Sequence, residues 1–184
     1  MTPTILNEAS DERGFSLIEA LVALGVLSGG LLAIASAFAS GMQMMMGSNM
    51  DFVAREKAAE AIESVFTARD TRTITWAMIH NVVGGSGADA GVFLDGPQGL
   101  KLAGTDGLVN TADDSSTLES IPQPGVDGLL GTADDSQMAL TSFTREVEIR
   151  DLGPTLRRLR VIIRYQVGAQ TRDYTIVTYI SSYA

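Results

Sequence analysis

The stretch RGFSLIEALVAL, residues 13–24, decides the fold of this 184-residue chain. A short charged leader ends at Gly14, an apolar run begins at once, and Glu19 is the one carboxylate that interrupts it. No charged residue lies between Ala20 and Met50. A helix needs about 20 apolar residues to cross a bilayer, so this run predicts a membrane-spanning helix. A carboxylate just inside such a helix costs about 2 to 3 kcal/mol, which makes Glu19 a functional candidate whose partner must be found.

The residues around Gly14 resemble the type IV prepilin signature. In that family a dedicated peptidase cuts after a glycine, the new first residue is usually an N-methylated phenylalanine, and the fifth mature residue is glutamate. Gly14, Phe15 and Glu19 match these positions. The apolar run follows the predicted cut, whereas in an ordinary secretory leader it precedes the cleavage site. The alternative is a plain signal-anchor helix in which Glu19 sits in the positive field of the helix amino terminus. That alternative leaves the spacing unexplained.

Cleavage after Gly14 would create a cationic amine on Phe15, one helical turn from Glu19. In a helical filament the glutamate of one subunit can meet the amine of its neighbour, and the pairing would relieve two desolvated charges together. Burying either charge alone is costly, so the pair would favour assembly in register. Glu19 can also pair with the amine of its own Phe15, and both arrangements stay open.

Composition divides the chain into five segments. We predict a prepilin leader at 1–14, a membrane or filament-core helix at 15–46, and an amphipathic continuation with a short helical piece at 47–83. An acidic Gly/Asp-rich loop region with two repeats follows at 84–140, and an antiparallel β-sheet at 141–184. The predicted fold class is α+β: a long N-terminal helix packed on a small antiparallel sheet. This is the pilin-like architecture that the resemblance also implies.

Periodicity supports the two packed layers. Apolar residues recur at helical spacing beyond Gly47, and alternate residues are apolar in 142–150 and in 158–167, with a third β-rich run at 174–180. The proposed helix stripe is Ala54, Ala58, Ala61, Ile62 and Val65, and the proposed inward strand residues are Phe143, Val147, Ile149, Leu159, Val161, Ile163, Tyr165 and Val167. The other face of the second strand carries Arg158, Arg160 and Arg164, which raises the alternative of a DNA-binding surface.

Charge and residue types narrow the function classes. The formal net charge of −9 divides into −4 for residues 1–83, −8 for 84–140 and +3 for 141–184. An acidic middle argues against a general nucleic-acid-binding surface and makes cations candidate ligands. The sequence contains no cysteine, and His80 is its only histidine. We find neither a nucleophile with a histidine base nor a phosphate-binding loop, so a membrane-anchored enzyme is disfavoured.

An internal repeat is the most distinctive feature outside the anchor. DGLVNTADDS at 106–115 recurs as DGLLGTADDS at 127–136. Calcium binds 6 to 8 oxygens from carboxylates, carbonyls and water, and each repeat offers three carboxylates and a threonine. The motif resembles short Asp/Gly calcium loops of secreted proteins, and its candidate Ca²⁺ ligands are Asp106, Asp113, Asp114, Asp127, Asp134 and Asp135. The alternative is a pair of solvated turns in which aspartates cap neighbouring backbone amides.

The resemblance implies a structural subunit of a type IV pilus or related filament, of the minor pilin kind. Its expected partners are other pilin subunits, the prepilin peptidase and, before assembly, inner-membrane lipid. Its expected location is the inner membrane, with the outer domain in the periplasm, and then the extracellular filament. A pseudopilin of a type II secretion system shares the same signature and stays an alternative, as does a minor pilin that binds DNA for uptake. We expect neither enzymatic activity nor general nucleic-acid binding.

Overall fold

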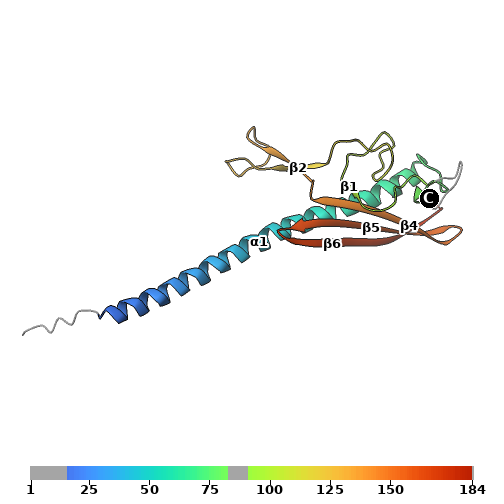
Figure 1. Ribbon diagram of the computed structural model, residues 1–184. Coiled ribbons are helices and arrows are strands. Elements are labelled where there is room, and N and C mark those ends of the chain that lie inside the picture. Colours follow the sequence, from blue (N-terminus) through green and yellow to red (C-terminus); the bar gives the residue numbers. More distant parts are fainter. Residues whose placement is uncertain (1–15, 83–90, 184) are drawn as a thin grey trace, which may run out of the picture. The chain divides into compact units, whose positions relative to one another are not determined.

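The computed structural model describes residues 16–82, apart from the side chain of Met46, and residues 91–183 (Figure 1). Within these residues one helix, α1 (Leu17–Asp70), is followed by six strands. The strands are β1 (Gln98–Gly99), β2 (Ser120–Gln123), β3 (Ser136–Ala139), β4 (Phe143–Gly153), β5 (Leu156–Val167) and β6 (Gln170–Ser181). The chain divides into two compact units, Met1–Met44 and Met45–Ala184. The predicted α+β class, a long N-terminal helix followed by a small antiparallel sheet, is confirmed.

The first unit contains the beginning of α1. Ser16 caps the helix, because its Oγ accepts a hydrogen bond from the Glu19 amide at 3.2 Å, the usual arrangement at a helix amino terminus. The helix continues without a break through Gly25, Gly29 and Gly30. A Cβ atom at any of these glycines would meet nothing within 4 Å, so packing inside this chain does not require them.

Two sheets form the β part of the second unit. The larger sheet has four antiparallel strands in the order β1-β4-β5-β6, and the smaller one is the β2-β3 hairpin. The three long strands match the three β-rich runs that the sequence predicts at 142–180. The short β1 is an addition from the loop region, where it pairs Gln98 with Arg145 and Gly99 with Thr144.

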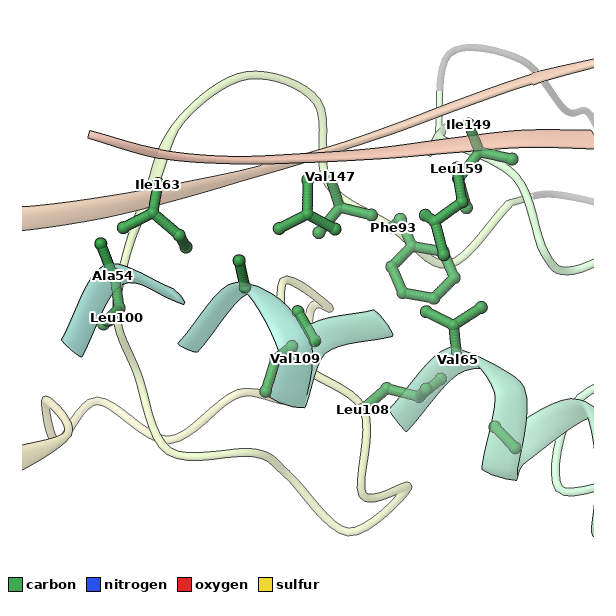
Figure 2. Packing of buried hydrophobic residues seen from close by; sticks show 14 of the residues in the cluster. Ala54, Val65, Phe93, Leu100, Leu108, Val109, Val147, Ile149, Leu159 and Ile163 are labelled. Atoms are coloured by element: carbon green, nitrogen blue, oxygen red, sulfur yellow. The ribbon is translucent and has the colours of Figure 1, made fainter. Parts of the chain in front are cut away.

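The core lies between the second half of α1 and one face of the larger sheet (Figure 2). The predicted strand pattern is correct: Phe143, Val147 and Ile149 are buried, as are Leu159, Val161, Ile163 and Tyr165, and Val167 at the end of β5 is partly buried against the core. Residues of the loop region complete the core, among them Phe93, Leu100, Leu108 and Val109. Most buried residues of α1 are small and recur every three or four positions, which places them on one face: Ala54, Ala58, Ala61, Val65 and Ala68. Val53 beside Ala54 is buried as well, and Ile62 of the predicted stripe is partly buried.

The helix ends differently from the expectation for 71–83. Residues 71–82 form turns rather than a second short helix. Arg72 adopts a left-handed backbone conformation (φ 58°), and the Thr73 amide donates to the Ala68 carbonyl at 2.9 Å. The Arg72 amide donates to the Arg69 carbonyl at 3.1 Å. These two bonds form a Schellman motif, which satisfies the last carbonyls and stops α1 at Asp70.

Candidate functional site

The amino terminus of α1 carries the first candidate site. Glu19 lies in the first helical turn with its side chain exposed, where the helix dipole favours a negative charge. Gly14 and Phe15, the predicted processing residues, lie outside the described residues. The structure therefore places Glu19 at the start of the helix, and the pairing of Glu19 with the Phe15 amine stays a prediction.

The first part of α1, from Leu17 to Met45, belongs to a helix that is long and apolar enough to cross a membrane. Large apolar side chains cover it on all sides and are exposed, so nothing in the described part of this chain shields them. A helix that is apolar all round is typical of a membrane span or of the interior of an assembly. The exposed residues are Leu17, Ile18, Leu21, Val22, Leu24, Val26, Leu27, Leu31, Leu32, Ile34, Phe38, Met42, Met44 and Met45.

The first Asp-Gly loop, residues 104–115, is closed by its own aspartates. Asp113 Oδ2 accepts hydrogen bonds from the Thr105 hydroxyl (3.1 Å) and the Asp106 amide (3.3 Å). Asp106 Oδ1 accepts from the Leu108 amide at 2.8 Å, and Asp114 Oδ2 accepts from the Asn110 amide at 2.9 Å. The Thr111 hydroxyl lies 2.8 Å from Asp113 Oδ1 and 3.1 Å from Asp114 Oδ1. Three carboxylates thus fix one short turn of backbone.

The second Asp-Gly loop, residues 125–136, repeats this geometry at the end of the β2-β3 hairpin. Asp134 Oδ2 accepts from the Asp127 amide at 3.4 Å, and Asp127 Oδ1 accepts from the Leu129 amide at 2.9 Å. Asp135 Oδ2 accepts from the Gly131 amide at 2.6 Å, and the Thr132 hydroxyl lies 2.7 Å from Asp134 Oδ1. The duplicated sequence therefore encodes a duplicated structure.

Each repeat begins two residues earlier than the sequence pattern predicts, at Gly104 and Gly125. A Cβ atom on Gly104 would lie 2.3 Å from Asp113 Oδ2, and one on Gly125 would lie 2.1 Å from Asp134 Oδ2. Only glycine lets the carboxylate approach the backbone this closely. The signal was present, because Gly104 and Gly125 are separated by the same interval of 21 residues as the rest of the repeat.

These contacts shift the acidity of three aspartates. The Thr111 hydroxyl lowers the pKa of Asp113, and the Thr132 hydroxyl lowers the pKa of Asp134, because each hydrogen bond stabilises the charged form. Burial raises the pKa of Asp106, with the charges of Asp113 and Asp114 adding to the effect. Among residues 16–82 and 91–183, no group of three or more acidic, histidine or cysteine side chains is arranged to hold a metal ion. The aspartates act as amide caps in this structure, and calcium binding stays a prediction.

A buried network links the first Asp-Gly loop to both layers. Arg145 on β4 is fully buried and lies 3.1 Å from Glu119, which in turn lies 2.8 Å from Lys57 Nζ on α1. Arg145 Nε donates to Asn110 Oδ1 at 3.0 Å, and Asn110 Nδ2 donates back to the Arg145 carbonyl at 2.9 Å. Burial alone would lower the pKa of Lys57, but Glu119 and Glu60 raise it above its usual value.

Arg145 was not among the residues predicted to face the core. Its position in the alternating strand pattern indicates burial, because Arg145 falls on the same side of the strand as Phe143 and Val147, which were predicted to face the core. A charged side chain on a core-facing position requires buried partners, and the loop residues Asn110 and Glu119 supply them.

A second polar cluster lies at the other end of the sheet. Arg157 Nε donates to Asp151 Oδ1 at 2.7 Å, and its guanidinium lies 4.1 Å from the ring centroid of Trp76. It also donates to the carbonyls of Trp76 and Ile79. His80 Nε2 lies 3.2 Å from Asp151 Oδ2. Because this cluster ties residues 71–82 to β4 and β5, we assign His80 and Trp76 to structural contacts.

The arginines on the outer face of the sheet are partly neutralised. Arg160 lies 3.1 Å from Glu148, and Arg164 lies 2.8 Å from Glu146 and 3.7 Å from Asp173. These cross-strand pairs leave less positive charge for phosphate groups than the sequence suggests. The DNA-binding alternative therefore loses support.

Comparison with protein-family models, curated proteins and solved structures finds no match for this chain. Function is therefore inferred from the residues themselves. The informative features are the polar start of an apolar helix, the continuity of that helix into the second unit, and the two matching Asp-Gly loops.

Proposed function

We propose that this chain is a structural, non-enzymatic subunit of a type IV pilus or related filament, of the minor pilin kind, which assembles through its N-terminal helix. The observation that carries the proposal is the continuity of α1 from Leu17 to Asp70. Its apolar first part is exposed along its length, and its second part packs on the antiparallel sheet. The Gly14-Phe15 junction lies immediately before this helix, and Glu19 lies in its first turn.

The proposed location of the protein changes on assembly. Before assembly the apolar helix lies in the inner membrane, with the outer domain in the periplasm, and after assembly the helix lies in the filament core. The prepilin peptidase and other pilin subunits are its partners. A pseudopilin of a type II secretion system would share each of these features, and the gene neighbourhood separates the two.

The amino terminus of the mature protein provides the direct test. We expect mass spectrometry of filament or membrane fractions to detect a first peptide that begins at Phe15 with a methylated amine. The physical reason is that the apolar helix begins just after the predicted cut, so cleavage leaves the whole anchor intact. An intact segment 1–14 on assembled protein would contradict the prepilin interpretation.

Replacing Glu19 by alanine should impair incorporation into filaments while leaving membrane insertion intact. The change removes a charge from an apolar helix, which favours insertion, but it also removes the candidate partner of a neighbouring Phe15 amine. Ser36→Ala is a matched control, because the Ser36 hydroxyl bonds only to the Ala33 carbonyl of its own helix among the described contacts. Quantitative immunoblots of sheared filaments and membranes measure both variants. Wild-type incorporation of Glu19→Ala would refute the pairing.

Calcium binding by the two Asp-Gly loops is a separate proposal, supported by their matching geometry. Binding to the folded state alone would stabilise it by about 2.7 kcal/mol per site at a hundredfold excess over the dissociation constant. A fragment beginning at Met45 should therefore melt at a higher temperature with millimolar calcium than with chelator. Asp113→Asn combined with Asp114→Asn should reduce that difference, whereas Asp173→Asn on the sheet should leave it unchanged.

Calcium binding is judged from the difference between the melting temperatures with calcium and with chelator, because the same aspartates also cap backbone amides. Loss of the caps would lower the melting temperature equally in both conditions. Equal melting curves for the unchanged fragment in calcium and in chelator, with no heat of binding in calorimetry, would leave amide capping as the role of the aspartates.

A further inference from the structure

The two Asp-Gly loops share a sequence and a geometry but differ in what their apolar residues contact. In the first loop Leu108 and Val109 are 0% and 3% exposed and belong to the core. The equivalent residues of the second loop, Leu129 and Leu130, are 63% and 60% exposed, and Val126 beside them is fully exposed. Figure 1 shows the β2-β3 hairpin standing apart from the larger sheet of its unit. The second loop therefore presents to solvent a surface that its twin buries.

Internal hydrogen bonds hold this exposed surface in shape. Asp127, Asp134 and Asp135 fix the second loop through the backbone amides at its turn. The loop is thus preorganised, and a partner would not have to order it on binding, which is a large part of the free-energy cost of association. A projecting, ordered cluster of exposed apolar residues is typical of an interaction site.

The first loop shows what kind of surface this motif fits. Its Leu108 and Val109 pack in the apolar core, and its Asn110 accepts a hydrogen bond from the guanidinium group of Arg145. The second loop has leucines at the two equivalent positions, Leu129 and Leu130, and carries the same three carboxylates, but Gly131 stands where the first loop has Asn110. Because the second loop is acidic as well as apolar, the surface that complements it is apolar and positively charged.

The outer face of the larger sheet offers such a surface. Near its β4-β5 turn, Arg158 is opposite Arg150 on β4 and opposite Tyr179 on β6. Leu152, Val177 and Tyr179 are exposed there. Among the described residues, neither Arg150 nor Arg158 pairs with a carboxylate, whereas Arg160 and Arg164 do. The Nε atom of Arg158 is buried and has no hydrogen-bond partner. We call Arg150, Leu152, Arg158, Val177 and Tyr179 the basic sheet patch.

We propose that the second Asp-Gly loop of one chain docks on the basic sheet patch of a second copy of this chain. In the proposed contact each copy uses its loop toward one neighbour and its patch toward another, so the arrangement is head-to-tail and extends to an open chain when the rotation between copies does not close a ring. A hairpin tip buries less area than a stable dimer requires, so the contact acts together with the helix contacts of an assembly. The inference rests on the proposed filament function for bringing copies together.

Cysteine cross-linking of the full chain in membranes tests the contact, because the sequence contains no cysteine. Leu129→Cys combined with Tyr179→Cys places one thiol on each proposed surface, and both native side chains are exposed. Oxidation with copper phenanthroline should produce dimers, trimers and higher species on non-reducing gels. Leu129→Cys with Gln166→Cys is the matched control, since Gln166 is an exposed residue at the far end of β5. We expect about tenfold more cross-linked product from the first pair, reflecting its higher effective concentration.

The arginine requirement is tested in the same cross-linking background. Arg158→Gln should reduce the cross-linked product strongly, whereas Arg164→Gln, whose native side chain already pairs with Glu146, should not. The proposal is overturned if the Tyr179 pair yields no more product than the Gln166 pair, if Leu129→Cys alone yields the same product, or if Arg158→Gln has no effect. Mass spectrometry of the amino terminus on the same membranes reports separately on the filament proposal: protein processed at Phe15 without cross-links overturns only the docking contact.

Discussion

Replacing Arg145 by alanine should lower the free energy of unfolding of the second unit by about 3 to 5 kcal/mol, the usual effect of breaking a buried ion pair. Arg145 is fully buried, and its loss leaves Glu119 Oε1 and Asn110 Oδ1 without the donors that they have at 3.1 and 3.0 Å. Lys57 still contacts Glu119 at 2.8 Å but reaches only its other oxygen. Urea denaturation of a fragment beginning at Met45 measures the effect.

Arg164→Ala is the matched control for this prediction. Arg164 lies on the neighbouring strand and also pairs with a glutamate, but its side chain is 36% exposed. Exposed pairs contribute at most about 1 kcal/mol, so the control should lose little stability. Combining Arg145→Met with Glu119→Gln should recover much of the loss, because it removes the unpaired buried charge, and Lys57 retains Glu60 at 2.7 Å. Equal effects of Arg145→Ala and Arg164→Ala would show that the buried network contributes no special stability.

Periodicity predicted the elements whose burial is regular. Alanines at helical spacing identified the buried face of α1, and alternation in 142–150 and 158–167 identified two strands with their correct inward faces. The prediction of a short helix in 71–83 was wrong for residues 71–82. Their apolar residues suggested a helix, and no glycine marks the point where α1 ends. Arg72 adopts the left-handed conformation that glycine usually adopts at a helix end, so the residue type gave no indication that the helix stops there.

The candidate loops show a different limit of sequence reasoning. The repeat revealed that two similar turns exist, and the structure confirms that they have similar geometry. The repeats differ locally at Asn110 against Gly131, and Asn110 is the residue that bonds to Arg145, but the residues that bury the first loop lie elsewhere in the chain. The first loop bonds to Arg145, which is 35 positions from Asn110 along the chain, whereas the second lies in a hairpin that pairs only β2 with β3. Whether a repeat is buried therefore depends on tertiary contacts, which the repeated sequence alone does not predict.

Leu108→Ala should destabilise the second unit by about 2 to 5 kcal/mol, because truncating a buried leucine removes apolar contacts and leaves a cavity. Leu108 has no exposed surface and belongs to the same core cluster as Val109 and Val65 (Figure 2). The same urea denaturation of the Met45 fragment measures the change, and the dependence of the free energy on urea should stay constant if the fold is retained.

Leu129→Ala is the matched control, since it changes the same residue of the same motif in the exposed copy. Leu129 is 63% exposed, so its truncation should change the stability by no more than about 0.5 kcal/mol. The pair of variants separates the two uses of one sequence: the first copy stabilises the fold, and the second leaves its apolar side chains free for a partner. A loss with Leu129→Ala as large as that with Leu108→Ala would mean that the second loop is packed against its own unit, and the docking proposal would lose its basis.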